Sequence, residues 1–252
     1  AASDVYKRQA DTNMKKAITL SAATLALLVA GASGVSGVSA ASVKAEKRNS
    51  STGKIGFRAN TTTPPDITNP ELSGVTGHGG TPGALAIDYA SDLAFGKHEI
   101  SAKSETYFAD ADTTAFNGTP VGAFVEMHDL RGLGSGGNNG TQLTVKQRDQ
   151  FKNDKGAELK GATLRFSSGK AANAGGGTYT PTAKGSFTLK LDTAQPVMST
   201  DGTVGQFLTS YGKATDYREN NAGGPISLKV PSGSDLAGDF STTLEWDLVT
   251  AP

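Results

Sequence analysis

The sequence predicts an all-β protein built around a single antiparallel β-sandwich-like domain. Apolar and polar residues alternate with a period of two in many short runs, which is typical of strands with one buried face. Clusters of Gly, Asn, Pro and Ser separate these runs and indicate turns. No stretch keeps the apolar stripe of an amphipathic helix, so we expect sheets that pack face to face.

The expected strands follow one another from residue 85 to the end of the chain. In the first, the apolar residues Leu85, Ile87 and Tyr89 alternate with small or polar ones. The same alternation recurs at 100–104, 121–127, 143–146, 163–166, 187–191, 226–230 and 244–248. Each run supplies two or three apolar side chains, enough for one sandwich core but not for two. We therefore expect one domain over residues 84–252.

The composition excludes several classes of protein and of site. The chain has 252 residues, 24 basic and 24 acidic side chains, and no Cys. Because nucleic-acid-binding proteins normally carry an excess of basic residues, a nucleic-acid partner is not expected. Without Cys, disulfides, thiol catalysis and Cys-ligated zinc are excluded.

The segments before the domain are expected to serve export and spacing. A basic start at 14–16, an apolar run at 17–32 and small residues at 38–40 predict a signal peptide over 14–40. Residues 1–13 lie upstream of its Met and are interpreted as a non-native segment. The apolar run is too short for a transmembrane anchor, so no membrane span is expected after cleavage. Residues 41–83 are mostly polar and Gly-rich, which predicts a disordered linker, although Ile55 and Phe57 alternate and leave an early strand open.

Trp246 is the first candidate for ligand contact. It alternates with Leu244 and Leu248, which favours a buried face, but a Trp ring also suits stacking on sugar rings. Glu245 and Asp247 then face outward, where they either contact a ligand or form a solvated strand face.

Loop residues are further candidates for ligand binding. The Gly-rich loop 132–140 contains Asn138 and Asn139, and loops on rigid sandwiches often carry function. A strand follows this loop, so its glycine spacing does not indicate a dinucleotide site. Tyr211 and Tyr217 flank a polar segment, and we expect one or both to be exposed as a stacking surface.

No catalytic residue, metal site or cofactor is expected. The three histidines, at 78, 98 and 128, lack metal-ligand spacing, and His128 beside Asp129 has no supporting nucleophile. Asp110 and Asp112 are hard oxygen ligands, but a polar turn explains them better than a calcium site. A glycan hydrolase needs two placed carboxylates, and no motif indicates them.

Several stretches together resemble the WxL family of Gram-positive surface proteins. The last strand contains Trp246-Asp247-Leu248, which is similar to the C-terminal signature of that family. Further similar stretches occur in the same order at 87–101, 129–136, 143–145 and 158–164. The resemblance implies a secreted protein at the cell surface whose C-terminal domain binds the cell wall, with peptidoglycan as partner, non-covalently and without catalysis.

The resemblance also implies a departure and an alternative. The family usually carries two Trp-x-Leu motifs, and Thr141 stands where the first Trp is expected. If that Trp contacts the wall, its loss impairs binding, whereas if it is a packing residue, its loss affects the core. WxL proteins also resemble one another in being associated with partner surface proteins, so binding to another surface protein instead of the wall is the alternative.

Overall fold

The structure is a computed structural model that describes residues 53–218, 222–234 and 236–250. The expected upstream segment, 1–13, and the expected signal peptide, 14–40, lie outside the described residues. The regular secondary structure of the described chain consists of β-strands and a three-residue 3-10 helix, η1 (Ala214–Asp216). In this part of the chain, no helix has the length and apolarity needed to cross a membrane.

The strands are β1 (Asp66–Thr68), β2 (Thr76–Gly79), β3 (Leu85–Ala90), β4 (Glu105–Phe108), β5 (Phe124–Asp129), β6 (Thr141–Gln147), β7 (Thr163–Phe166), β8 (Gly169–Asn173), β9 (Thr182–Ala183), β10 (Phe187–Thr188), β11 (Gln195–Thr200), β12 (Gly205–Tyr211), β13 (Ile226–Val230) and β14 (Leu244–Thr250).

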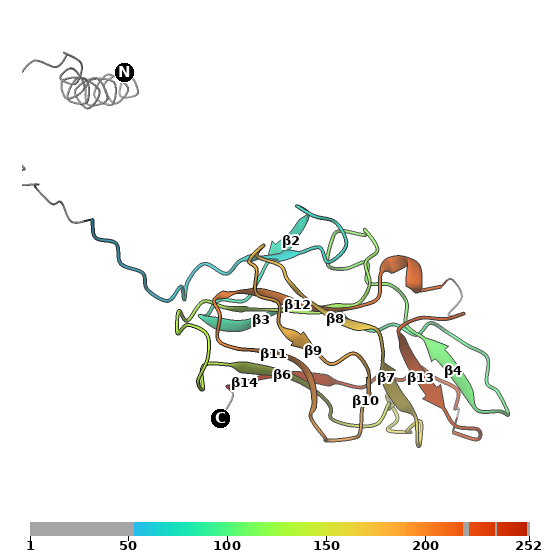
Figure 1. The fold of residues 1–252 in the computed structure, drawn as a ribbon. Helices are drawn as coiled ribbons and strands as arrows, with labels where there is room; N and C mark the ends of the chain where they lie inside the picture. Colours follow the sequence, from blue (N-terminus) through green and yellow to red (C-terminus); the bar gives the residue numbers. More distant parts are fainter. Residues whose placement is uncertain (1–52, 219–221, 235, 251–252) are drawn as a thin grey trace, which may run out of the picture. The chain divides into compact units, whose positions relative to one another are not determined.

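Two four-stranded antiparallel sheets stack face to face as a β-sandwich, which confirms the predicted fold class (Figure 1). One sheet has the strand order β3-β5-β12-β8, and the other has the order β14-β6-β11-β9. Contacts of β14 with β3 and of β8 with β9 align the two sheets edge over edge. Strands β3 and β14 therefore lie at the same side of the sandwich.

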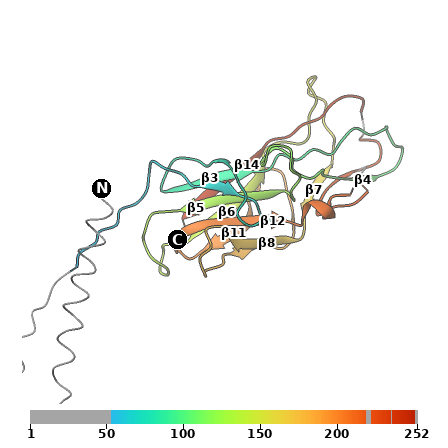
Figure 2. The same cartoon turned by 90° about the horizontal axis from the view of Figure 1, so that it is seen from above.

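A third sheet, with the order β10-β7-β13-β4, lies at one end of the sandwich (Figures 1 and 2). Its residues Leu164, Phe166 and Ile226 belong to the same apolar cluster as Met127 of β5 and Val145 of β6. All five side chains are at most 1% exposed. The three sheets therefore share one core, and residues 55–252 form one compact unit.

The part of the expected linker from residue 60 to 83 packs on the sandwich instead of extending from it. It contains the β1-β2 hairpin, which lies over the β3-β5-β12-β8 sheet (Figure 1). Ile67 of β1 is fully buried against Phe116 and Phe124. We call residues 60–83 the N-terminal strap. The expectation of a disordered linker over 41–83 is therefore wrong for the strap.

The Gly-rich composition misleads here because two glycines allow close packing of the strap. A Cβ atom at Gly77 would lie 2.6 Å from the carbonyl oxygen of Ala115 and 2.7 Å from Ile67. A Cβ atom at Gly80 would collide with the carboxyl group of Asp88. These glycines let the backbone approach its neighbours, which composition alone does not distinguish from flexibility.

Two expected local features are absent from the described chain. Residues 100–104 are not a strand: the strand begins at Glu105, and Ile100 is 62% exposed. Ile55 and Phe57 do not form the early strand that was left open, and they are 82% and 90% exposed. Both segments alternate in sequence without a sheet partner in the described part of the molecule.

Candidate functional site

Strand β14 places Trp246 at one edge of the sandwich. Leu244, Trp246 and Leu248 are partly buried and pack against the core cluster. Asp247 is exposed on the opposite face. The strand therefore alternates as predicted, and Trp246 is a packing residue that keeps part of its surface accessible.

Trp246 also lines a groove of about 1040 Å³. Segments 90–100 and 236–246 line this groove, together with apolar side chains of the β10-β7-β13-β4 sheet. Its ring-bearing side chains are Phe95, His98, Tyr107, Phe151, Phe240 and Trp246. The volume is at the upper end of the range of ligand-binding sites. We call it the Trp246 groove.

Ring contacts fix the shape of the groove on the side of segment 90–100. The rings of Phe95 and Phe151 meet edge to face, with centroids 6.4 Å apart and an angle of 80° between planes. His98 stacks on Tyr107 at 4.1 Å and 24°, and its Nε2 lies 2.5 Å from the carbonyl oxygen of Phe95. Since that oxygen only accepts, Nε2 donates the hydrogen bond.

The rim of the groove offers exposed apolar and charged groups. Ile100 and Leu236 line it and are 62% and 49% exposed. Lys97 and Asp239 form an ion pair of 3.6 Å that joins the two lining segments, with both side chains about nine-tenths exposed. Exposed pairs contribute at most about 1 kcal/mol. The pair does not lock the rim, and a ligand can compete for these groups.

Comparison with known proteins identifies the family. A family model described as "WxL domain surface cell wall-binding" matches residues 44–252. The chain belongs to the WxL family. Searches of curated proteins and of solved structures found no match. The WxL match covers the strap as well as the sandwich, and it establishes a cell-surface, cell-wall-associated role.

The two WxL motif positions of this chain lie on neighbouring strands. Leu143 of β6 is paired with Leu248 of β14, and Thr141 is paired with Thr250. Thr141, where the first Trp is expected, is 1% exposed. The Trp246 groove adjoins the opposite end of β14. Position 141 is therefore a packing position of this WxL domain, separate from the groove.

Polar groups surround Thr141. The Nη2 atom of Arg131 donates to Thr141 Oγ1 at 2.9 Å, to the carbonyl oxygen of Asn139 at 2.8 Å and to Asp129 Oδ2 at 2.7 Å. The carboxyl group of Asp129 is buried, and this ion pair compensates its charge. A threonine hydroxyl thus completes a hydrogen-bonded cluster where the family usually has an indole.

The two acidic residues beside Trp246 differ in whether their carboxyl groups are free to contact a binding partner. Glu245 forms ion pairs with Arg148 Nε at 2.5 Å and Lys146 Nζ at 3.2 Å. The hydrogen bond from Arg148 lowers the pKa of Glu245 below its ordinary value. Asp247 is exposed and has no ion pair within the described residues. Of the two acids, Asp247 is therefore the one available to a binding partner.

The structure does not bring the Asn-containing loop to the groove. Asn138 is exposed, whereas Asn139 Nδ2 donates to the carbonyl oxygens of Leu133 at 3.2 Å and Gly134 at 3.1 Å. This loop precedes Thr141 and lies at the far end of β14. The role of Asn139 in the structure is to hold the loop, and ligand binding by Asn138 stays a prediction.

Tyr211 and Tyr217 are buried, so the expectation that they form an exposed stacking surface is wrong. They are 1% and 9% exposed. The Tyr217 hydroxyl donates to the carbonyl oxygen of Tyr211 at 2.7 Å and accepts from the amide of Ala123 at 3.0 Å. The ring of Tyr211 packs on Phe166 at 4.9 Å. The polar residues between the two tyrosines suggested exposure, but both rings turn into the core.

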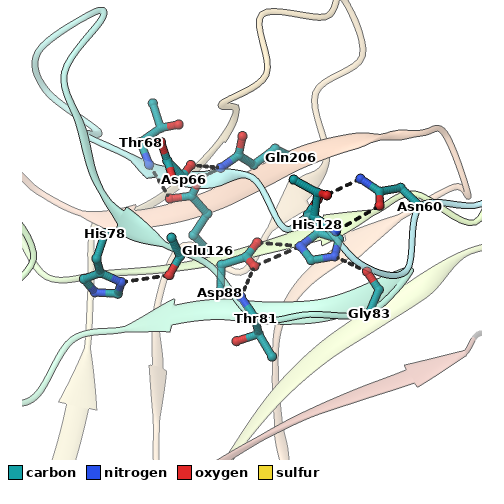
Figure 3. A network of polar contacts seen from close by, with 12 residues as sticks. Asn60, Asp66, Thr68, His78, Thr81, Gly83, Asp88, Glu126, His128 and Gln206 are labelled. Atoms are coloured by element: carbon teal, nitrogen blue, oxygen red, sulfur yellow. Dashed lines mark hydrogen bonds and ion pairs between the residues drawn. The ribbon is translucent and has the colours of Figure 1, made fainter.

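A second polar cluster lies beneath the strap (Figure 3). His128 Nδ1 lies 2.9 Å from both carboxylate oxygens of Asp88, and Nε2 lies 2.8 Å from the carbonyl oxygen of Gly83. Both neighbours are acceptors, so both ring nitrogens donate and the ring is an imidazolium. Burial lowers the pKa of His128, but the hydrogen bonds to Asp88 and Gly83 outweigh burial and raise the pKa above its ordinary value.

Glu126 joins the strap to the sheet in the same cluster. Its Oε2 accepts from the amide of Thr68 at 2.9 Å, and its Oε1 accepts from Gln206 Nε2 at 2.5 Å. Gln206 Nε2 also donates to the carbonyl oxygen of Asp66 at 2.6 Å. Desolvation raises the pKa of Glu126 to about 8, although these hydrogen bonds from Thr68 and Gln206 lower it.

The side chains of this cluster are buried and hydrogen-bonded within the fold. His128 and Glu126 are 0% exposed, and both nitrogens of the His128 ring are occupied by acceptors. Asp112 accepts from the hydroxyl groups of Tyr89 at 2.6 Å and Ser91 at 2.5 Å, which favours the polar turn over a calcium site. Among the described residues, no group of His, Asp and Glu side chains is placed to hold a metal ion.

The sequence indicated Trp246 as a contact residue but did not indicate most of the groove. Phe95, Ile100, Leu236 and Phe240 lie in segments rich in Gly, Ser and Asp that are not strands. For Leu236 and Phe240, the only signal is the presence of large apolar residues in an otherwise polar loop. Such residues need an explanation when they stay exposed, because loops are usually polar.

Proposed function

We propose that this WxL protein is secreted and binds the cell wall of a Gram-positive bacterium non-covalently and without catalysis, with peptidoglycan as its ligand. The match to the wall-binding family carries the proposal. The Trp246 groove is the binding site, since it combines the motif residue with a ligand-sized hollow.

The chemistry of the groove suits a glycan. Sugar rings present C–H faces that pack on aromatic side chains, and Phe95, Phe240 and Trp246 supply such surfaces. Sugar hydroxyls and charged groups of peptide stems need polar partners, which Lys97 and Asp239 offer at the rim. Apolar faces inside and polar groups at the rim are the usual arrangement of a binding site.

Binding without catalysis is supported by the position of the acidic groups. Glycoside hydrolysis uses two carboxyl groups held about 5–10 Å apart across the bond that breaks. The groove carboxyl groups of Asp92, Glu99 and Asp239 are all exposed, and Asp239 is already paired with Lys97. None of them has the burial that tunes a catalytic acid.

A matched pair of leucines tests the site. Leu236 and Leu191 are 49% and 50% exposed, but only Leu236 lines the groove. We expect Leu236→Ala to weaken sedimentation with purified Gram-positive walls by about fivefold, while Leu191→Ala leaves it unchanged. Because both side chains are half exposed, both variants should melt like the parent protein.

The same assay separates the ligands. Walls stripped of proteins and secondary polymers contain peptidoglycan alone, and we expect the protein to bind them as well as whole walls. Binding to whole walls but not to stripped walls would replace peptidoglycan with an attached polymer. Absence from both pellets, together with capture by a purified surface protein, would support the alternative that the chain binds another surface protein.

A further inference from the structure

We propose that residues 55–58 of one copy of this chain add as a strand to the free edge of β14 in a second copy. The sheet β14-β6-β11-β9 then continues from one molecule into the next. This inference goes beyond wall binding and does not depend on it. It rests on an open edge and on an unpaired segment that match each other.

Strand β14 is a long and incomplete edge. It has seven residues and is paired only with β6 in the described chain. An unpaired edge presents backbone donors and acceptors to any extended segment. Leu244, Trp246 and Leu248 on its inward face are only partly buried. An added strand would pair with part of this edge and extend the cover over its inward face at Leu248.

Residues 55–58 form an alternating segment without a sheet. Ile55 and Phe57 are 82% and 90% exposed, the largest values among the large apolar side chains of the described chain. Residues 53–59 make no backbone hydrogen bond there. Large apolar residues that alternate in an extended, unpaired segment have the pattern of a strand that lacks its partner.

The side chains of the two elements are complementary. Directly opposite residues of paired strands share a face of the sheet. An antiparallel register that places Phe57 opposite Leu248 also places Arg58 opposite Asp247. Phe57 then extends the apolar inward face, and Arg58 meets the acid that has no ion pair within the described residues. Opposite charges at facing positions contribute about 0.2–1 kcal/mol.

Several other edge strands fit this segment less well. Strand β8 at the far edge of the facing sheet carries the exposed Lys170, which repels Arg58. Strands β9 and β10 have two residues each, and β4 has four. Every copy carries both β14 and the segment, so the contact is head to tail and can join further copies. A second copy is therefore the occupant that the chain itself supplies.

The state of association of the full chain, purified after export, tests the proposal. We expect sedimentation velocity over a concentration series to show self-association. Phe57→Asp should leave only monomer and should not change the thermal melt, because the Phe57 side chain is 90% exposed. Val204→Asp is the matched control, since Val204 is 49% exposed and lies outside both elements. Its association should equal that of the parent protein.

A charge exchange tests the register. Arg58→Asp and Asp247→Arg should each weaken association by up to about fivefold, and the double variant should recover most of the loss. Monomer at every concentration, or association that Phe57→Asp does not change, would overturn the proposal. Leu236→Ala should associate normally, so loss of wall binding and loss of association are separate outcomes.

Discussion

At the residue scale, two buried titratable groups decide how the fold responds to pH. Glu126 and His128 both have a pKa above their ordinary values in the folded protein. The contribution of Glu126 is fully present below about pH 4.5 and is lost as pH rises to about 8. The contribution of His128 is fully present below its unfolded pKa of about 6.5 and is lost as pH rises through the folded value. Both groups therefore stabilise the fold at mildly acidic pH.

We predict that the melting temperature falls by roughly 5–10 °C between about pH 5 and pH 8.5. Glu126→Gln removes one of the two titrations and should flatten this decline. Glu99→Gln changes an exposed carboxyl group and serves as the control. Melts that stay level over this range, or an unchanged slope in the Glu126→Gln variant, would show that the buried carboxyl group does not titrate there.

A buried hydroxyl gives a second prediction at this scale. The Oγ1 atom of Thr209 is buried without a hydrogen-bond partner in the described structure. Replacing it with a methyl group removes the desolvation cost, so Thr209→Val should raise the free energy of unfolding by about 1 kcal/mol. Thr141→Val is the matched contrast, because it deprives Arg131 of an acceptor. Denaturant titrations should show opposite signs for the two variants.

At the element scale, the sequence predicted the strands that have one solvent-exposed face. It did not predict the strands whose consecutive side chains are buried. Strands β13 and β14 alternate clearly and lie where expected. In β12, both Phe207 and Leu208 are buried, because the core covers one face of its sheet and the strap covers the other. In β11, Val197 and Met198 are both buried in the same core cluster, beside an irregularity in the pairing with β6. Such burial removes the alternation on which a period-two search depends.

The candidate site shows the same limit. The motif at Trp246 is local and is legible in the sequence. The groove needs segments 90–100 and 236–246 to meet at the third sheet. No local pattern encodes that meeting, which depends on long-range strand pairing. The prediction that Tyr211 and Tyr217 are exposed was wrong for a related reason. A polar segment between two residues does not determine where their rings point.

Strand β14 joins stability to binding, which gives a third prediction. Trp246 packs on the core and lines the groove. We expect Trp246→Ala to lower the free energy of unfolding by about 2–4 kcal/mol and to weaken wall binding in the fraction that stays folded. Trp246→Phe should restore most of the stability and part of the binding. Full wall binding by the folded Trp246→Ala variant would show that the ligand binds outside the groove.

At the scale of the whole molecule, the strap places the start of the folded domain earlier in the chain than the alternating strands indicate. Every residue of β5 is buried, which requires cover on both faces of the sheet. The strap supplies the outer cover through Ile67 and the hydrogen bond from Thr68 to Glu126. Without it, the Asp88–His128 pair and the apolar cluster around Phe124 would face solvent.

Truncation tests this boundary directly. A chain that begins at Ala84 lacks the strap, and one that begins at Ile55 keeps it. We predict that the shorter chain loses most of its stability and aggregates, because Phe116, Val121 and Phe124 become exposed. Ile67→Ala in the longer chain is the milder version and should cost about 2–4 kcal/mol. Equal melting temperatures for the two chains would mean that the sandwich folds without its strap and that residues 60–83 only rest on it.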